Sequence, residues 1–407
     1  MNKKWRKLDN TAKIFSVDQK EGNMFRLSVI LKEKVDYNIL NISVIKSLDN
    51  FKEYKVGIKT GFFWNYLEFN YKEPIIEEEK EKPCKVINFR KNNDYLFKVT
   101  YFNNKINLDI YHVLTDGVGA TSFFKSIIYN YLNLKYELNN EYINNNYVID
   151  EYLKNVDKKN KFKRKEKYGF LIKEKSNLSK NKTFHYILDL SKLKKICKEK
   201  KVSITEYLTA IYISAIYKTV YDKKSNRDIS VTIPVDLRKY YNSKTLSNFF
   251  TCMTVEGDLV KSKYFSFEKV LKQVHNEFKD KLGINNIKNY LTSDVKLGTN
   301  IAIRLVPLFL KKIVIQNFNR WLCQKTTTSL SNIGPIKIEE KYKKYIDNIM
   351  LLVNSGKLQK IKCSICSYEN KLTVTINSNL IKSDFEKEFY KLLQRYIGKV
   401  GYLSNVV

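Results

Sequence analysis

Hydrophobic and polar positions change their period near residue 112, which predicts a strand followed by a helix. Residues 106–111 alternate apolar with polar or aromatic side chains, and this period of two is typical of a half-buried strand. Asp116 and Gly117 interrupt the alternation. Beyond them, apolar residues recur at helical spacing at Phe123, Phe124, Ile127, Ile128, Tyr131 and Leu132. Thr115 or Asp116 is suited to cap this helix by accepting backbone N–H groups.

The rest of the chain shows the same mixture of strand and helix patterns. Residues 228–235 predict a strand, and residues 361–376 predict two strands joined in a hairpin. Ser203 and Glu206 form a capping box that predicts the start of a helix. A second Ser-x-x-Glu motif at residues 383–386 predicts the start of the last helix.

A lysine-dense stretch divides the chain into two parts. Residues 154–167 lack apolar periodicity, which is typical of a solvated connector. Strand and helix patterns occur on both sides of this stretch, and no repeat of 20 to 50 residues is visible. We therefore expect an α/β protein with mixed sheets in two subdomains, residues 1–165 and 166–407.

Composition favours packed cores. Of the 407 residues, 43% are hydrophobic and 14% are aromatic, which argues against disorder. The six cysteines are irregularly placed and do not suggest a disulfide framework. The N-terminal residues run directly into a polar segment, so no signal peptide is predicted. A cytoplasmic monomer is the expectation.

The net charge of +32 comes mostly from lysine. One interpretation is the codon bias of an AT-rich genome, because asparagine, isoleucine and tyrosine are also abundant. Another is attraction to a polyanion or an anionic membrane surface. Arginine is scarce and no nucleic-acid motif accompanies the lysines, so nucleic-acid binding is not expected. A basic field would also attract coenzyme A or an acidic carrier protein.

Residues 301–318 form the most apolar stretch of the sequence. Arg304, Lys311 and Lys312 interrupt it, so no run of about 18 uncharged apolar residues exists and no spanning helix is predicted. We expect a core or channel-lining helix here. Attachment of this helix to a membrane surface, as a peripheral contact, is the alternative.

His112, Asp116 and Gly117 are the leading candidates for chemistry, because they form the pattern H-x-x-x-D-G at the predicted strand–helix turn. Histidine is the usual general base near neutral pH, and only three histidines occur in the chain. Glycine at residues 117 and 119 lets a ligand or another backbone segment approach. The alternative interpretation is a buried histidine that precedes an ordinary capped helix.

Other catalytic and metal-binding patterns are weak or absent. Cys363 and Cys366 have the spacing of a zinc or redox half-site, but they lie in a predicted strand without a second pair nearby. A structural role is therefore expected for both. The sequence has no Walker A loop, H-E-x-x-H motif or dinucleotide fingerprint, and no metal is expected.

The H-x-x-x-D-G motif resembles that of the acyltransferase superfamily of chloramphenicol acetyltransferase, BAHD acyltransferases, polyketide-associated acyltransferases and condensation domains. Four further segments resemble the same superfamily in order and spacing: Trp5 to Phe15, Pro234 to Arg238, Ser247 to Phe250 and Ser331 to Pro335. The closest group is the alcohol acetyltransferase-like proteins of low-GC bacteria. Two features depart from the pattern: Tyr111 replaces a first histidine, and the D-F-G-W-G signature of plant BAHD enzymes is absent.

The resemblance implies two chloramphenicol-acetyltransferase-like subdomains that form a pseudo-dimer, with the histidine at their interface and a tunnel from either side. It implies that His112 is the general base and that Asp116 forms a salt bridge that fixes the loop. Arg238 is the expected partner of Asp116, because a guanidinium can meet a carboxylate with two parallel bonds. A surface arginine at a strand end is the alternative for Arg238.

The resemblance also suggests groups that line the substrates. Ser329, Ser331 and Asn332 are candidate oxyanion or substrate-lining residues, and Asn248 is a candidate supporting residue that would line the site. An ordinary turn is the alternative for residues 332–335.

Acyl-CoA, for example acetyl-CoA, is the implied co-substrate, with no permanently bound cofactor and with a small alcohol or amine as acceptor. An acyl carrier protein as donor, or a non-catalytic basic binding protein on this scaffold, are the alternatives.

Overall fold

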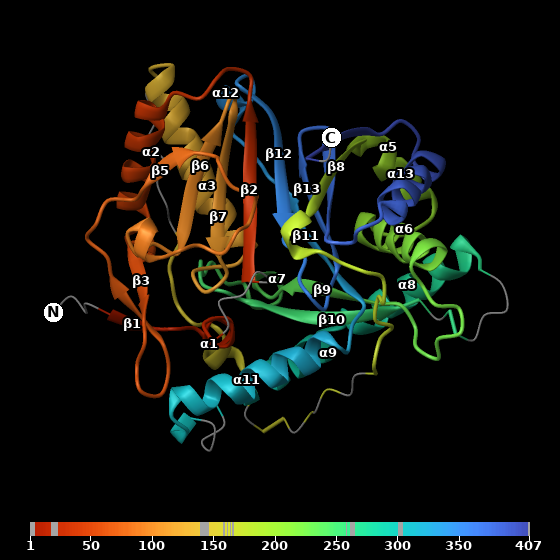
Figure 1. Cartoon of the computed structure of the whole chain (residues 1–407). Helices are drawn as coiled ribbons and strands as arrows, with labels where there is room; N and C mark the ends of the chain where they lie inside the picture. Colours follow the sequence, from red (N-terminus) through yellow and green to blue (C-terminus); the bar gives the residue numbers. More distant parts are fainter. Residues whose placement is uncertain are drawn as a thin grey trace.

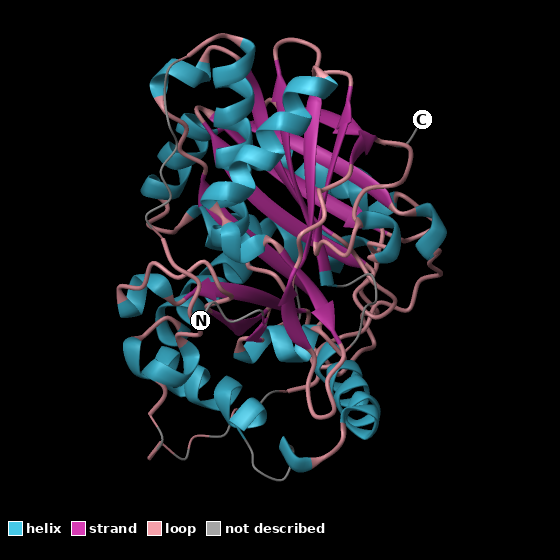
Figure 2. Ribbon diagram, turned by 90° about the vertical axis from the view of Figure 1, so that its left-hand side faces the viewer, coloured by secondary structure: helices cyan, strands magenta, loops and turns pink. Residues whose placement is uncertain are grey.

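Two α/β lobes make up the protein, and they lie side by side in the computed structural model (Figure 1). The structure describes residues 5–17, 23–138, 146–157, 159, 160, 162, 164, 167–257, 259, 260, 265–299 and 304–405. Strands run through the centre of the molecule, and helices lie around them (Figure 2). Of the predicted connector, residues 158, 161, 163, 165 and 166 lie outside the described residues.

The first lobe is built on a five-stranded sheet with the order β12-β2-β7-β6-β5. Its strands are β2 (Met24–Leu31), β5 (Ile76–Glu78), β6 (Phe97–Phe102), β7 (Lys105–Tyr111) and β12 (Ile346–Val353). Helices α2 (Tyr37–Asn50) and α3 (Gly117–Lys135) pack on each other beside this sheet. A small sheet of β1 (Trp5–Lys7), β4 (Tyr66–Phe69) and β3 (Val56–Lys59) adjoins it. The predicted strand and helix around residue 112 are confirmed as β7 and α3.

The strand predicted at residues 106–111 is present, but the alternation does not reflect one solvent-exposed face, because β7 is buried on both faces. The Asp109 carboxylate accepts two hydrogen bonds from the guanidinium of Arg26, at 2.8 and 2.6 Å. Arg26 also pairs with Glu79, and Asn107 accepts from the hydroxyl of Ser28 at 2.7 Å. The polar positions of the alternation therefore form a buried hydrogen-bonded network, which compensates their loss of solvent.

The second lobe is built on a seven-stranded mixed sheet with the order β10-β9-β11-β13-β14-β8-β15. Its strands are β8 (Lys182–Asp189), β9 (Ser230–Asp236), β10 (Phe250–Glu256), β11 (Thr328–Pro335), β13 (Ile361–Tyr368), β14 (Lys371–Ser378) and β15 (Gly401–Ser404). Its main helices are α5 (Leu190–Glu199), α6 (Ile204–Thr219), α8 (Phe267–Lys281) and α13 (Asp384–Tyr396). The predicted hairpin is the antiparallel pair β13–β14.

Both helix starts predicted in the second lobe are confirmed, but only one has the capping bonds. The capping box of Ser203 and Glu206 is confirmed at the start of α6. Ser383 stands at the N-cap position of α13 but makes no capping bond, and its hydroxyl instead accepts from Lys182 Nζ at 2.9 Å. The chain also continues beyond α13 into β15, an edge strand that the sequence pattern did not predict.

β12 connects the two lobes. It belongs to the predicted second subdomain by position in the chain, yet it pairs antiparallel with β2 in the sheet of the first lobe. Its other side contacts β13, where Ser364 Oγ donates to the carbonyl of Leu351 at 2.9 Å. A division of the chain at residue 165 therefore does not describe this strand, because its backbone bonds are made in the first lobe.

The expectation of a core or channel-lining helix over residues 301–318 is wrong. The structure has a helix, α11 (Leu308–Cys323), along the lower edge of the molecule in Figure 1, and much of its apolar side faces solvent. Residues 301–303 lie outside the described residues. No helix in the described part of the chain is long and apolar enough to span a bilayer.

The remaining helical segments complete the fold. These are α1 (Asn10–Phe15), α4 (Tyr152–Asn155), α7 (Arg238–Tyr241), α9 (Ile284–Thr299) and α12 (Glu340–Lys343), with 3₁₀ turns η2 (Lys52–Tyr54), η3 (Arg90–Asn92) and η4 (Leu178–Lys180). Helix α1 has the most important position among these segments, because it lies between α11 and the turn that contains His112.

Candidate active site

His112 lies at the junction of the two lobes, directly after the end of β7. Its partly buried ring packs against three phenylalanines, with centroid distances of 4.6 Å to Phe15, 5.0 Å to Phe25 and 5.5 Å to Phe250. Phe15 and Phe25 belong to α1 and β2 of the first lobe, whereas Phe250 begins β10 of the second. Both lobes therefore hold the partly buried imidazole.

Asn248 fixes the protonation pattern of the ring. Its Oδ1 lies 2.9 Å from His112 Nδ1. Its Nδ2 donates to Asp9 Oδ2 at 3.0 Å and to the carbonyl of His112 at 3.1 Å. Because both of these partners can only accept from Nδ2, the amide orientation is determined and Oδ1 must face the ring. Nδ1 therefore carries the proton, and the lone pair of Nε2 remains available as a base.

Asp9 is a site residue that sequence reasoning did not identify. Its Oδ1 accepts from the backbone N–H of Ala12 at 2.7 Å and so caps α1. Its Oδ2 accepts from both the backbone and the side chain of Asn248. Burial raises the pKa of Asp9 to about 6. An aspartate before a helix is a recognisable cap signal, but its contact with Asn248 joins residues 239 positions apart.

The surroundings of His112 favour the neutral imidazole. Burial lowers the pKa of His112 below its ordinary value, and Asp116, its own backbone carbonyl and Asn248 partly oppose this effect. A pKa below 6.5 means that the ring is mostly uncharged at pH 7, so it can accept a proton there.

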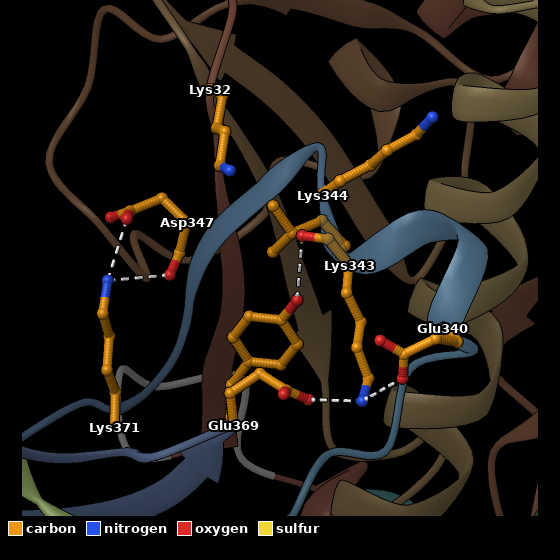
Figure 3. A pocket seen from close by; sticks show the side chains of 9 residues that line it. Lys32, Glu340, Lys343, Lys344, Asp347, Glu369 and Lys371 are labelled. Carbon is orange, nitrogen blue, oxygen red and sulfur yellow. Dashed lines mark hydrogen bonds and ion pairs between the residues drawn. The ribbon is translucent and has the colours of Figure 1, made fainter.

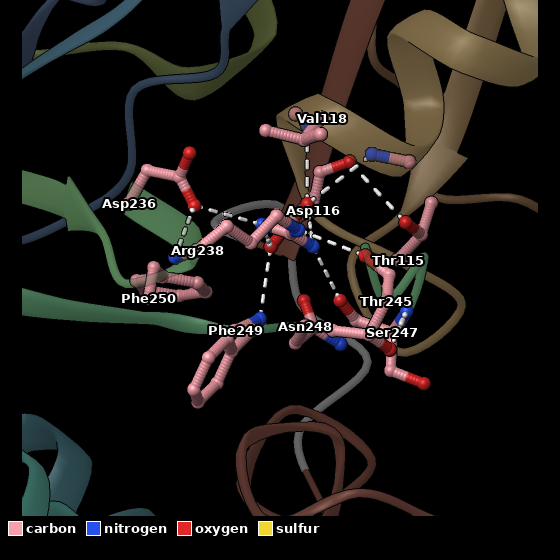
Figure 4. Close-up of polar contacts among 12 residues, drawn as sticks. Thr115, Asp116, Val118, Asp236, Arg238, Thr245, Ser247, Asn248, Phe249 and Phe250 are labelled. Atoms are coloured by element: carbon pink, nitrogen blue, oxygen red, sulfur yellow. Dashed lines mark hydrogen bonds and ion pairs between the residues drawn. The ribbon is translucent and has the colours of Figure 1, made fainter. Parts of the chain in front are cut away.

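The Asp116 carboxylate is held by five donors (Figure 4). Arg238 meets it with two bonds, Nη1 to Oδ2 at 2.9 Å and Nη2 to Oδ1 at 3.1 Å. The backbone N–H groups of Val118 and Gly119 donate to Oδ1 and cap α3, and that of Phe249 donates to Oδ2 at 2.9 Å. The carboxylate thus accepts bonds both from α3 of its own lobe and from Arg238 and Phe249 of the second lobe.

Arg238 is not a surface residue. Its side chain is 8% exposed, and besides Asp116 it donates to the carbonyls of Thr245 and Ser247. The expected ion pair with Asp116 is therefore present, and the alternative of an exposed strand-end arginine is excluded.

Gly119 is required by the close approach of the second lobe. A Cβ at this position would lie 2.6 Å from the carbonyl oxygen of Leu246 and 2.0 Å from Thr115 Oγ1. At Gly117, a Cβ would lie 2.8 Å from Cγ2 of Ile333. The groups that approach these glycines are therefore other residues of the protein and not a ligand. The absence of a side chain at both positions lets the two lobes pack closely at this turn.

The segment that contains Ser329, Ser331 and Asn332 lies on β11 and reaches Gly117 through Ile333. Ser329 and Ser331 are half-buried and project from the face opposite to the fully buried Leu330. The amide of Asn332 is engaged elsewhere: Nδ2 donates to Thr205 Oγ1 at 2.9 Å and Oδ1 accepts from the N–H of Gly334 at 2.8 Å. The oxyanion roles of all three remain predictions.

A surface hollow at the start of β12 is separate from this site (Figure 3). Lysines and carboxylates line it: Lys343 pairs with Glu340 and Glu369, and Lys371 pairs with Asp347. Lys32 and Lys344 line it as well. The paired charges neutralise each other, and His112 does not line the hollow. Its chemistry therefore offers no second candidate active site.

Cys363 and Cys366 are buried free thiols on β13. Burial raises the pKa of Cys366 to about 12, so the thiol is protonated and unreactive. Within the described ranges, no group of three or more His, Cys, Asp or Glu side chains could hold a metal ion.

The fold is that of known acyltransferases and condensation domains. The first condensation domain of the calcium-dependent antibiotic synthetase aligns with a TM-score of 0.67 at 10% identity, covering 97% of both chains. Polyketide synthase associated protein 5 from Mycobacterium tuberculosis aligns at 0.63 and 11% identity, covering 97% of this chain and 98% of that one. TRI101 of Fusarium sporotrichioides, solved with coenzyme A and T-2, aligns at 0.63 and 9% identity over 98% and 99%. These similarities establish the two-lobed fold.

Sequence comparison assigns the family. No curated protein matches the chain. The family model described as alcohol acetyltransferase matches residues 152–397, which is more than half of the 407 residues. The match includes Arg238, Asn248 and Ser329 to Asn332, whereas His112 and Asp116 precede it. The resemblance stated from the motifs is thereby confirmed, and the chain belongs to the alcohol acetyltransferase family.

Proposed function

We propose that the protein transfers an acyl group from acyl-CoA to a small alcohol or amine, with His112 as the general base. The observation that carries this proposal is the arrangement of the imidazole. Asn248 holds Nδ1–H, burial keeps the ring neutral at pH 7, and Nε2 has a free lone pair at the junction of the lobes. An acceptor held beside Nε2 meets a base in the correct protonation state.

The chemistry then proceeds in two steps. Nε2 takes the proton of the acceptor O–H or N–H while the oxygen or nitrogen attacks the thioester carbonyl, and a tetrahedral oxyanion forms. The carbon–sulfur bond breaks as the oxyanion collapses, and the coenzyme A thiolate takes the proton from the imidazolium. Ser329 and Ser331 are our candidates for donors to the oxyanion, because their segment approaches Gly117 through Ile333. No acyl-enzyme and no permanently bound cofactor are part of this scheme.

Coenzyme A is the favoured donor for two reasons. A structural neighbour of the chain was solved with coenzyme A and T-2, and the net charge of +32 attracts the anionic phosphates of this substrate. Condensation domains are also structural neighbours, which keeps a carrier-protein thioester as the second candidate donor.

The test is a free-thiol assay with purified protein. Acetyl-CoA and a panel of alcohols and amines are supplied, and thiol release is followed against a sample without acceptor. Acceptor-dependent release supports the proposal, while release only from an acetylated carrier protein supports the second candidate. If neither donor reacts with any acceptor, acyl transfer to this panel is rejected.

Activity should fall on the acid side below pH 6.5 and should depend on Asn248. The neutral imidazole is the reactive form, and burial lowers its pKa, so activity is lost as the pH falls through this lowered value. Asn248→Ala removes a contact that raises the pKa of His112. We expect kcat to fall by about tenfold or more and the acid limb of kcat/KM to move to lower pH.

A buried asparagine away from the histidine provides the control. Asn92 also donates two hydrogen bonds from its Nδ2, to the carbonyls of Tyr95 and Phe97. Asn92→Ala should lower the melting temperature but leave the acid limb in place. An unchanged pH profile in Asn248→Ala would show that this residue does not orient the ring.

A further inference from the structure

Helix α11 presents a stripe of apolar residues to solvent, interrupted near its C-terminal end by the exposed Asn317 and Arg320. Phe309 is 67% exposed, Ile313 59% and Val314 62%, although side chains of this kind are usually buried. Leu310 and Trp321 are also exposed and lie on the same side at helical spacing. Single exposed apolar residues are ordinary, but a stripe that extends over the length of a helix marks an interaction surface.

The side of α11 that faces the protein contains a buried lysine. Leu308 and Ile315 pack against Val17, while Lys311 is buried between them. Lys311 Nζ donates to the carbonyl of Phe63 at 2.8 Å and lies 4.1 Å from the ring centroid of Trp64. The helix therefore differs from an ordinary surface helix: a lysine is buried beside Leu308 and Ile315, while several other large apolar residues face outward. Ordinary folding of this domain does not explain that arrangement.

The apolar surface continues from α11 onto the loop between β3 and β4. The N–H of Leu308 donates to the carbonyl of Phe62 at 2.8 Å, which fixes the loop beside the start of the helix. Phe62 is 70% exposed and packs edge-on against Phe63. Leu305, just before the helix, is 68% exposed. Loop and helix together form one face along the lower edge of the molecule in Figure 1, which we call the α11 face.

In the segment of the chain that contains α11, all charged side chains are positive. Between Asp294 and Glu339 the sequence contains seven lysines and arginines and no acidic residue. Arg304 and Arg320 are exposed at the two ends of the stripe. At the C-terminal end, Trp321 Nε1 donates to the hydroxyl of Tyr168, so two aromatic side chains with polar edges lie there. Aromatic residues of this kind are enriched where protein meets the headgroup region of a membrane.

We infer that the α11 face docks the protein onto the surface of a bilayer that contains anionic lipids. The apolar stripe enters the boundary between headgroups and acyl chains, and Arg304 and Arg320 contact lipid phosphates. A second copy of the chain fits this face less well, because it would bring two basic segments together in a protein whose net charge is already +32. Docking of this kind needs no spanning helix, and it does not depend on the proposed reaction.

The test is sedimentation of the full chain with vesicles of phosphatidylcholine alone and of phosphatidylcholine mixed with phosphatidylglycerol. The wild type should bind the mixed vesicles and bind phosphatidylcholine weakly, with binding reduced by salt. The double variant Phe309→Ser, Ile313→Ser should bind the mixed vesicles at least about tenfold more weakly, because each lost apolar side chain removes burial in the membrane.

Two control pairs distinguish binding through the α11 face from non-specific binding to vesicles. Phe102 and Ile381 are 54% and 61% exposed outside the α11 face, and their replacement by serine should leave vesicle binding unchanged. Arg304→Gln, Arg320→Gln should weaken binding to mixed vesicles, whereas the same change at the exposed Lys46 and Lys194 should have a smaller effect. Near-equal melting temperatures would establish that all variants are folded.

Three outcomes would overturn the inference. The first is absence of binding by the wild type, and the second is equal binding by the wild type and the Phe309, Ile313 variant. The third comes from sedimentation velocity without lipid: self-association of the wild type that the double variant abolishes, with no vesicle binding, would mean that a second copy covers the α11 face. None of these measurements involves acyl transfer. They therefore test membrane docking even if the proposed acyltransferase function is rejected.

Discussion

His112→Ala is expected to reduce kcat for acyl transfer by about 10²- to 10⁴-fold, the usual contribution of a general base. Within the described residues, neither carboxylate near this site is free to replace the imidazole. The Asp116 carboxylate is used by five donors, and the Asp9 carboxylate by Ala12 and Asn248. The ring is only partly buried, so its removal should change the melting temperature little. Initial rates of thiol release and a thermal melt measure the two effects.

His275 offers the matched control. Its side chain is 41% exposed, and its Nδ1 lies 3.0 Å from Glu206 on α6, away from the junction of the lobes. His275→Ala should retain the wild-type kcat. Full turnover in His112→Ala would reject the assignment of the base, whatever the control shows.

Asp116→Asn is expected to lower the free energy of unfolding by about 3–5 kcal/mol, because it removes one partner of a buried ion pair. Arg238 would keep its charge at 8% exposure, and an amide cannot accept both guanidinium bonds while it also accepts three backbone N–H groups. The expected loss of kcat is smaller than in His112→Ala, since Asp116 positions the loop and does not contact the reacting atoms. Denaturant unfolding measures the stability, and thiol release measures the rate.

Asp236 provides the matched control, because it forms a partly exposed ion pair with the same arginine. It contacts Arg238 Nη1 at 3.0 Å, but its side chain is 30% exposed. Asp236→Asn should cost less than about 1 kcal/mol, because solvent screens such a pair. Similar losses of stability in the two variants would contradict the special role of the Asp116 pair.

Local signals predicted the elements around the candidate site well. The change from a period of two to helical spacing located β7 and α3, because both are set by which side chains face the core. The capping box located the start of α6 for a similar reason, since its bonds join residues three apart. The Asp116–Arg238 partnership came from the motif resemblance, and the structure contains it.

Features that depend on distant contacts were not predictable from these signals. The polar residues of β7 look solvent-facing in sequence, but Arg26 from β2 and Glu79 supply their buried partners. Asp9 looks like a simple helix cap until Asn248 is placed beside it. Helix α11 was assigned to the core because of its hydrophobicity, and hydrophobicity alone does not say whether the apolar side meets protein or another medium.

β12 limits how this protein can be divided for expression. A truncated chain that stops near residue 165 would leave β2 without its outer neighbour, and the free edge would span the apolar sequence Met24–Leu31. Such an edge recruits strands from other molecules and promotes aggregation. A fragment that starts near residue 166 would contain β12 without its partner strand. Each half therefore completes the other, and co-expression of the two pieces should recover soluble material that neither gives alone.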